Sequence, residues 1–163
     1  NCVGDYASFA SNDSNNPGSG VGPITNNANF INCTALGTYS FATGVSSNSG
    51  RFVNCTALGG NSFSWGIPFG GDHSGAEYIN CVAKGSRSFG VTTSNTPAGT
   101  FTGRFINCTA LEVFAFGKDT HSNSATTGLL YNCYSDDGFA AIAGTGKIRN
   151  SLDNTTFSII NLG

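Results

Sequence analysis

Residues 52–63 read Phe-Val-Asn-Cys-Thr-Ala-Leu-Gly-Gly-Asn-Ser-Phe, and this stretch decides the fold because the chain repeats it. Each copy has a large apolar residue, then any residue, then Asn-Cys. The copies are Phe30–Cys33, Phe52–Cys55, Tyr78–Cys81, Phe105–Cys108 and Leu130–Cys133, with a shortened copy at Asn1-Cys2. The spacings between successive cysteines, 31, 22, 26, 27 and 25 residues, are typical of a solenoid in which each repeat forms one coil stacked on the last.

Aligning the copies on Cys predicts which side chains build the core. A large apolar residue stands three places before each Cys, a small residue stands two places after it, and Phe stands eight places after it at 41, 63, 89 and 116. Such alternation is typical of strands whose inward faces share one core. We therefore expect an all-β parallel β-helix of about six coils over residues 1–142. Residues 143–163 are expected to form a closing strand or cap.

The Asn of each copy falls where the alternation breaks, between the large apolar residue and the Cys. Because Asn tolerates left-handed dihedral angles, we expect it to bend the strand and to bond to the equivalent Asn one coil away. Asn32, Asn54 and Asn107 also match the Asn-x-Thr glycosylation acceptor. We expect these amides to be buried in the ladder, where they would be poor acceptors.

Six cysteines in a chain of 163 residues invite a disulfide interpretation. All six occupy one position of the repeat, however, so stacking would place them in a column about 4.8 Å apart with side chains pointing the same way. That arrangement makes the disulfide dihedral of about 90° hard to reach. We expect buried free thiols. With only His73 and His121 available, the spacings predict neither a zinc site nor any other cofactor.

Composition excludes several classes of function. Charged residues make up only 10% of the chain, the net charge is −2, and no Lys/Arg cluster occurs, which argues against nucleic-acid binding. No apolar run reaches the roughly 20 residues of a membrane span, so we expect no membrane insertion. No signal peptide is visible. The chain opens in mid-motif, from which we expect a fragment of a longer protein.

The pattern Phe-x-Asn-Cys-Thr-Ala-x-Gly followed by Ser-Phe resembles the right-handed parallel β-helices of bacteriophage tail fibres and tailspikes, over about residues 1–142. This resemblance implies a homotrimer of three packed helices in the virion tail that binds a bacterial surface polysaccharide. It also implies that some relatives cleave the glycan with carboxylates on the helix face or between subunits. It carries no catalytic residue over to this chain.

Two other classes of protein form solenoids of the same kind and remain open as alternatives. One is a secreted polysaccharide lyase or glycoside hydrolase that acts as a monomer. The other is a structural shaft, or an adhesin at the bacterial cell surface, without a glycan site of its own. A stable trimer would favour the tail-fibre class, whereas a monomer would favour the others.

A pair of carboxylates is the candidate catalytic site. Four residues after Cys, the column contains Gly at 37, 59 and 85, then Glu112 and Asp137. Stacking would place these two side chains on one face about 5 Å apart, within the range used for glycoside hydrolysis. Asp136 stands beside them as a third candidate. The alternative is an exposed acidic patch at the end of the helix.

Two further groups of residues matter for the site. Four residues before Cys, Arg51, Glu77 and Arg104 occupy successive coils, which predicts a structural ion-pair ladder. In the segment 64–73, Trp65 could stack on a sugar ring while Asp72 and His73 bind its hydroxyl groups. The alternative is a Trp65 packed on its own coil or on a neighbouring subunit.

Overall fold

The computed structural model describes just over half of the chain. The described residues are 2–4, 25–26, 29–37, 41, 47–48, 50–60, 63, 76–86, 89, 100–101, 103–113, 116, 125–126, 128–139, 141–142 and 146–163. Within these ranges the only regular secondary structure is β-strand. The predicted all-β fold is therefore confirmed for the described part of the chain.

The strands form three sheets. The largest has 13 strands, which in spatial order are β1 (Cys2–Gly4), β4 (Cys33–Ala35), β7 (Thr56–Ala57), β9 (Val82–Ala83), β12 (Thr109–Ala110), β15 (Tyr134–Ser135), β17 (Lys147–Asp153), β14 (Leu129–Tyr131), β11 (Arg104–Ile106), β8 (Glu77–Ile79), β6 (Arg51–Val53) and β3 (Asn29–Ile31), with β18 (Ser158–Leu162) beside β17. The smaller sheets contain β10 (Thr100–Phe101), β13 (Ala125–Thr126) and β16 (Ala141–Ile142), and β2 (Thr25–Asn26) and β5 (Ser47–Asn48).

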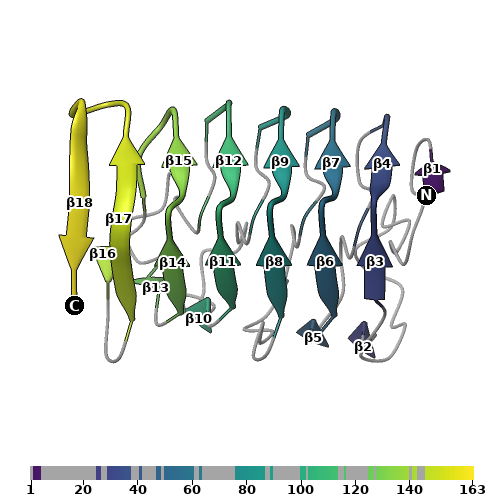
Figure 1. The fold of residues 1–163 in the computed structure, drawn as a ribbon, viewed down its shortest axis with the longest axis horizontal. Coiled ribbons are helices and arrows are strands. Elements are labelled where there is room, and N and C mark those ends of the chain that lie inside the picture. The colour runs from purple at the N-terminus through teal and green to yellow at the C-terminus, as the bar shows by residue number, and fades with distance from the viewer. Residues whose placement is uncertain are drawn as a thin grey trace, which may run out of the picture.

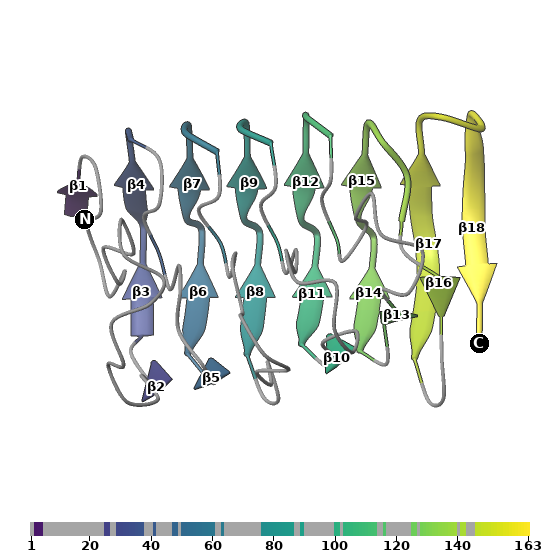
Figure 2. The ribbon, with the colours of Figure 1, turned by 180° about the vertical axis from the view of Figure 1, so that it is seen from behind.

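The strands stack as a solenoid. Figure 1 shows them side by side along the long axis, with the N-terminus at one end and the C-terminus at the other. Every described strand except β18 pairs in parallel with its counterpart one repeat away, as Phe52 does with Phe30 and with Tyr78. Seen from behind in Figure 2, the same strands succeed one another in the same order. The prediction of a parallel-strand solenoid is thus confirmed.

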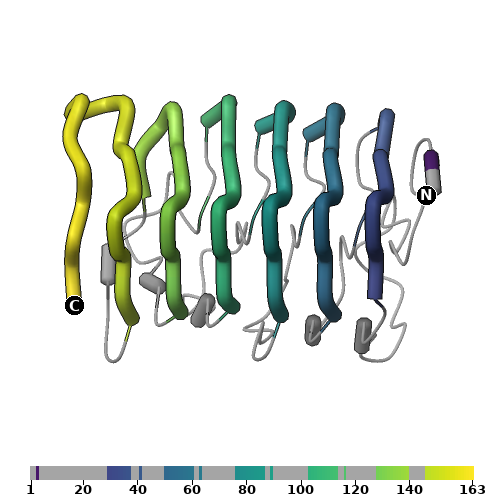
Figure 3. Tube along the Cα trace, viewed as in Figure 1, coloured from purple at the N-terminus to yellow at the C-terminus, as the bar shows by residue number. Residues whose placement is uncertain are grey.

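The described coils bend at the Asn of the motif. The residues 32, 54, 80, 107, 132 and 150 all have φ between 47 and 54°, in the left-handed region that Asn tolerates better than most residues. Figure 3 shows the resulting kink at the same level in successive rungs. The bend explains why the repeats from β3 to β15 are each split into two short strands, whereas β17 continues through its bend at Asn150.

The Asn side chains form the predicted ladder, but on the outside of the solenoid. Asn54 Nδ2 donates to Asn32 Oδ1 at 3.1 Å, Asn80 to Asn54 at 3.1 Å, and Asn107 to Asn80 at 3.0 Å. All these residues are exposed, so the expectation of buried amides is wrong. The left-handed bend turns the Asn side chain outward, whereas the Cys that follows it points into the core.

Two columns of aromatic rings fill the core. The rings of Phe30, Phe52, Tyr78 and Phe105 stack in one column, and those of Phe41, Phe63, Phe89 and Phe116 stack in the other. Within a column the ring centroids are 4.6–5.1 Å apart and the planes lie within 17° of parallel. Between columns the rings meet edge to face at 5.5–6.0 Å. Both geometries are favourable for aromatic pairs and add to the area buried.

The cysteines form a third inward column. Cys33, Cys55, Cys81, Cys108 and Cys133 are free and buried, which confirms the prediction for these five residues. Each thiol from Cys55 onward donates to a backbone carbonyl of the neighbouring coil at 3.3–3.5 Å. The Cys side chain therefore contributes a weak donor as well as a small apolar volume.

The stack continues for one coil more than the Asn-Cys motif indicates. Ile148, Arg149, Asn150 and Ser151 pair with the coil before them as another copy of the motif, with Ser in place of Cys. Ile148 and Ser151 are buried, and Asn150 donates to Asn132. β18 then pairs antiparallel with β17, as expected of a closing strand.

Substitutions of Asn80 distinguish its role in the hydrogen-bonded ladder from its role in the left-handed backbone bend. Asn80→Ala loses ladder bonds on both sides and places Ala at a left-handed position, which we expect to cost about 2 kcal/mol in the free energy of unfolding. Asn80→Gly loses the same bonds but tolerates the backbone, so it should cost about 1 kcal/mol less. Urea unfolding of both variants measures the difference. Equal losses would contradict a backbone role for this position.

The buried thiol of Cys108 predicts a fall in stability at alkaline pH. Burial, followed by the hydrogen bond with Cys133, raises the pKa of the Cys108 thiol, whereas an unfolded Cys ionises near pH 8.5. The contribution of Cys108 to the free energy of unfolding should be constant below about pH 8.5 and should decrease as the pH rises above it. Urea unfolding between pH 7 and 10 measures this slope. Cys108→Ser, which mimics Ser151 of the same column, should reduce the slope, and an unchanged slope would contradict the assignment.

Candidate functional site

The outward face of the 13-stranded sheet carries the exposed apolar side chains of the repeat. They stand two residues before and three residues after Cys, away from the inward Phe and Cys columns. Those more than a third exposed are Ile31, Leu36, Leu58, Leu111 and Tyr131. The Asn ladder and the half-buried Thr34, Thr56 and Thr109 lie between these two columns in sequence. Aligned exposed apolar residues of this kind mark surfaces that another molecule covers.

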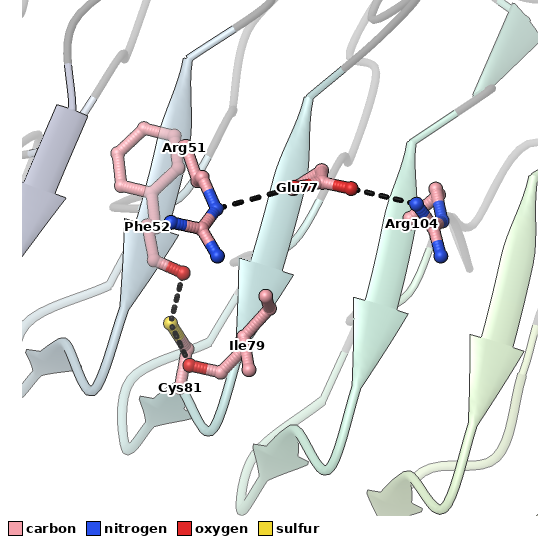
Figure 4. Close-up of polar contacts among 6 residues, drawn as sticks. All are labelled: Arg51, Phe52, Glu77, Ile79, Cys81 and Arg104. Carbon is pink, nitrogen blue, oxygen red and sulfur yellow. Dashed lines mark hydrogen bonds and ion pairs between the residues drawn. The ribbon is translucent and has the colours of Figure 1, made fainter.

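The predicted ion-pair ladder crosses the same face. Arg51 Nε lies 3.3 Å from Glu77 Oε2, and Arg104 Nη1 lies 2.7 Å from Glu77 Oε1. Figure 4 shows Glu77 between the two arginines, with Cys81, which follows β8, directed at the carbonyl oxygens of Phe52 and Ile79. Because both carboxylate oxygens of Glu77 are engaged, this residue is structural. Exposed pairs of this type add little to stability.

Glu112 and Asp137 occupy equivalent places on successive coils. β12 and β15 pair with Ala110 opposite Ser135, and each carboxylate lies two residues beyond its paired residue. Glu112 is exposed and Asp137 is half-buried. In the preceding coils the column holds Gly, and a Cβ added at Gly85 would lie 2.3 Å from the backbone of Gly59 and Gly60. A side chain at this position therefore requires a turn that is less closely stacked on its neighbour.

Asp136 belongs to a separate hydrogen-bond group. Its Oδ1 accepts a bond of 2.5 Å from the Tyr134 hydroxyl and one of 3.1 Å from Asn154 Nδ2. The bond to the carboxylate raises the pKa of Tyr134, because it favours the protonated hydroxyl. Asp136 thus ties the coil of β15 to the turn after β17.

The predicted sugar-binding residues are not among those that the structure describes. Trp65, Asp72 and His73 lie outside the described residues, so their assignment stays a prediction. Among the described residues, no three His, Cys, Asp or Glu side chains gather in a way that could hold a metal ion. None of the described segments forms an apolar helix of membrane-spanning length.

Comparisons with family models, curated proteins and solved structures gave no match to this chain.

Sequence reasoning missed part of the surface at the C-terminal end of the solenoid. Asn154 and the turn that contains it follow the seventh copy of the motif, which was not recognised because Ser151 replaces Cys. The sequence Ile148-Arg149-Asn150-Ser151 indicates this copy, because Ser is close to Cys in size and can donate the same hydrogen bond. Ser151 Oγ indeed donates to the Arg149 carbonyl at 3.0 Å.

Proposed function

We propose that this chain is a bacteriophage tail-fibre or tailspike component that adsorbs to a bacterial surface polysaccharide. In this proposal each chain forms a right-handed parallel β-helix of about six coils, and three chains pack into a homotrimer. The site of action is outside the cell, on the virion tail. The sequence resemblance to tail fibres suggests this role, and the outward face of the sheet is the observation that carries it.

The outward face supports a packed assembly for a simple physical reason. The inward positions of the motif are filled by the aromatic and cysteine columns and by buried Ala residues, so within the described coils the outer surface is the one open to binding. The exposed Ile31, Leu58 and Leu111 come from coils spread along the stack, and a neighbouring solenoid could cover them together. A stable protein interface buries about 800 Å² on each partner, which favours a partner that runs along the stack over one that touches a single coil.

The mass of the native protein and its glycan binding test the proposal together. Sedimentation equilibrium at several concentrations should give the mass of three 16.7 kDa chains. The same trimer should bind at least one member of an array of bacterial capsular polysaccharides and O-antigens. A monomer would overturn the assembly. A trimer that binds none of these glycans would replace adsorption with the role of a structural shaft or adhesin module.

A second candidate function rests on the equivalent places of Glu112 and Asp137 on paired coils. Such a pair could act as acid and nucleophile in glycoside hydrolysis, in a secreted enzyme or in a tailspike with depolymerase activity. Asp136, which already accepts two hydrogen bonds, is the weakest of the three carboxylates for this role.

Separate substitutions test the carboxylate pair. If the pair is catalytic, Glu112→Gln and Asp137→Asn should each lower polysaccharide turnover by at least about 100-fold, while the unfolding midpoint changes little because Glu112 is exposed and Asp137 half-buried. Release of reducing ends from a bound glycan measures turnover. Glu77→Gln is the matched control, since it removes a carboxylate of the ion-pair ladder and should leave turnover unchanged. Turnover unaffected by the first two changes would remove the pair as the site.

A further inference from the structure

Phe157 combines two features that are unfavourable for a folded chain. It lies in the turn at residues 154–157 that joins β17 to β18, at the C-terminal end of the stack in Figure 1. Its φ is 51°, a left-handed conformation that is rare and strained for a bulky side chain. Its side chain is also 84% exposed, so packing within the chain does little to offset that strain.

The other described residues with positive φ have a visible reason for it. The Asn residues of the ladder tolerate this conformation and gain amide bonds along the stack. Phe89 and Phe116 share the left-handed backbone, but both are fully buried and stack in the aromatic core. Gly138 has no Cβ. Phe157 differs from all of these, because its ring is presented to the outside.

Hydrogen bonds hold the turn that contains Phe157, and polar residues precede and follow Phe157 in the sequence. Asp153 Oδ1 accepts from the Thr155 backbone N–H at 2.8 Å and from its hydroxyl at 2.6 Å. The hydroxyls of Thr156 and Ser158 are 2.6 Å apart. Asn154 is bound to Asp136 of the coil before it. The ring therefore stands on a fixed backbone, which reduces the entropy lost when a ligand binds.

The residues that flank the ring in sequence are amphipathic and uncharged, and the carboxylates of Asp153 and Asp136 bond to the turn itself. Ile159, the next large residue, is 60% exposed, while Thr155, Thr156 and Ser158 supply hydroxyl groups. No residue from Asn154 to Gly163 carries a charged side chain. A flat apolar surface rimmed by hydroxyl donors and acceptors matches a pyranose ring, which has an apolar C–H face and a hydroxyl-bearing edge.

We infer that Phe157 is a stacking platform for a sugar ring of the bacterial surface polysaccharide, at the β17–β18 turn. This inference rests on the proposed function and adds a binding residue to it. The strained backbone presents the ring outward, and the neighbouring hydroxyl groups orient the sugar. A second copy of the chain is the alternative occupant, and the small size of the turn makes it the poorer match to a protein interface.

Phe157→Gly tests the inference because its effects on stability and on binding should have opposite signs. Gly adopts the left-handed backbone without strain, so the variant should unfold about 2–4 °C higher than the wild type. Its affinity for the array polysaccharide that binds the wild type best should fall about tenfold. Phe157→Tyr keeps the ring and should keep the affinity within about twofold.

A distant substitution provides the matched control. Val3→Thr removes an exposed apolar side chain but retains a β-branched residue in β1, at the other end of the stack from the β17–β18 turn, so it should leave the affinity unchanged. An equal loss in both variants would indicate general hydrophobic adhesion and overturn the assignment to Phe157.

Other outcomes separate this inference from the function on which it rests. If the wild type binds a polysaccharide and Phe157→Gly binds it equally well, the platform is wrong while adsorption stands. If Phe157→Gly changes the mass in sedimentation equilibrium, the ring is a contact between chains and the inference is overturned. If the wild type binds no polysaccharide of the array, both the inference and the adsorption function fail.

Discussion

In-register stacking of like side chains on successive coils is the constraint on which the rest of this structure depends. The Asn bend maintains it, because each left-handed Asn bonds through its amide to the next along the stack, as Asn80 does with Asn54. Side chains on a strand alternate between faces, so a slip of one residue would turn the Phe and Cys columns toward solvent. The aromatic stacks and the thiol-to-carbonyl contacts reinforce the same register from the inside.

The same constraint divides the molecule into an occupied interior and an available exterior. Aromatic rings and thiols fill the inward columns, which leaves the outer columns for any partner or ligand. Some outer columns are themselves structural, since Glu77 holds two arginines and the Asn amides bond to one another. The exposed aliphatic residues of the outward face, such as Ile31 and Leu58, and the exposed ring of Phe157 are available to a partner or ligand outside the chain.

The C-terminal end of the solenoid shows how the repeat is stopped. Ser151 takes the place of Cys in the last copy, and β18 then runs antiparallel along β17. Ile160 packs against the core, so the closing strand covers part of the end of the aromatic stack. The turn required for this reversal places Phe157 on the surface in a strained conformation.

The repeat by itself determined the strand architecture, the inward columns, the free thiols, the ion-pair ladder and the Asn ladder. All of these follow from one motif. Residues at equivalent positions of successive coils lie next to one another, and the alternation of side chains along a strand determines which of them point inward. Only the tertiary structure decided that the Asn amides face outward, since the direction of a side chain at a left-handed bend depends on the backbone around it. The same is true of the last coil, where Ser151 is identified as a core residue by its pairing with the coil before it. The exposure of Phe157 likewise arises from the antiparallel hairpin of β17 and β18, because the repeat motif does not specify the conformation of the turn at residues 154–157.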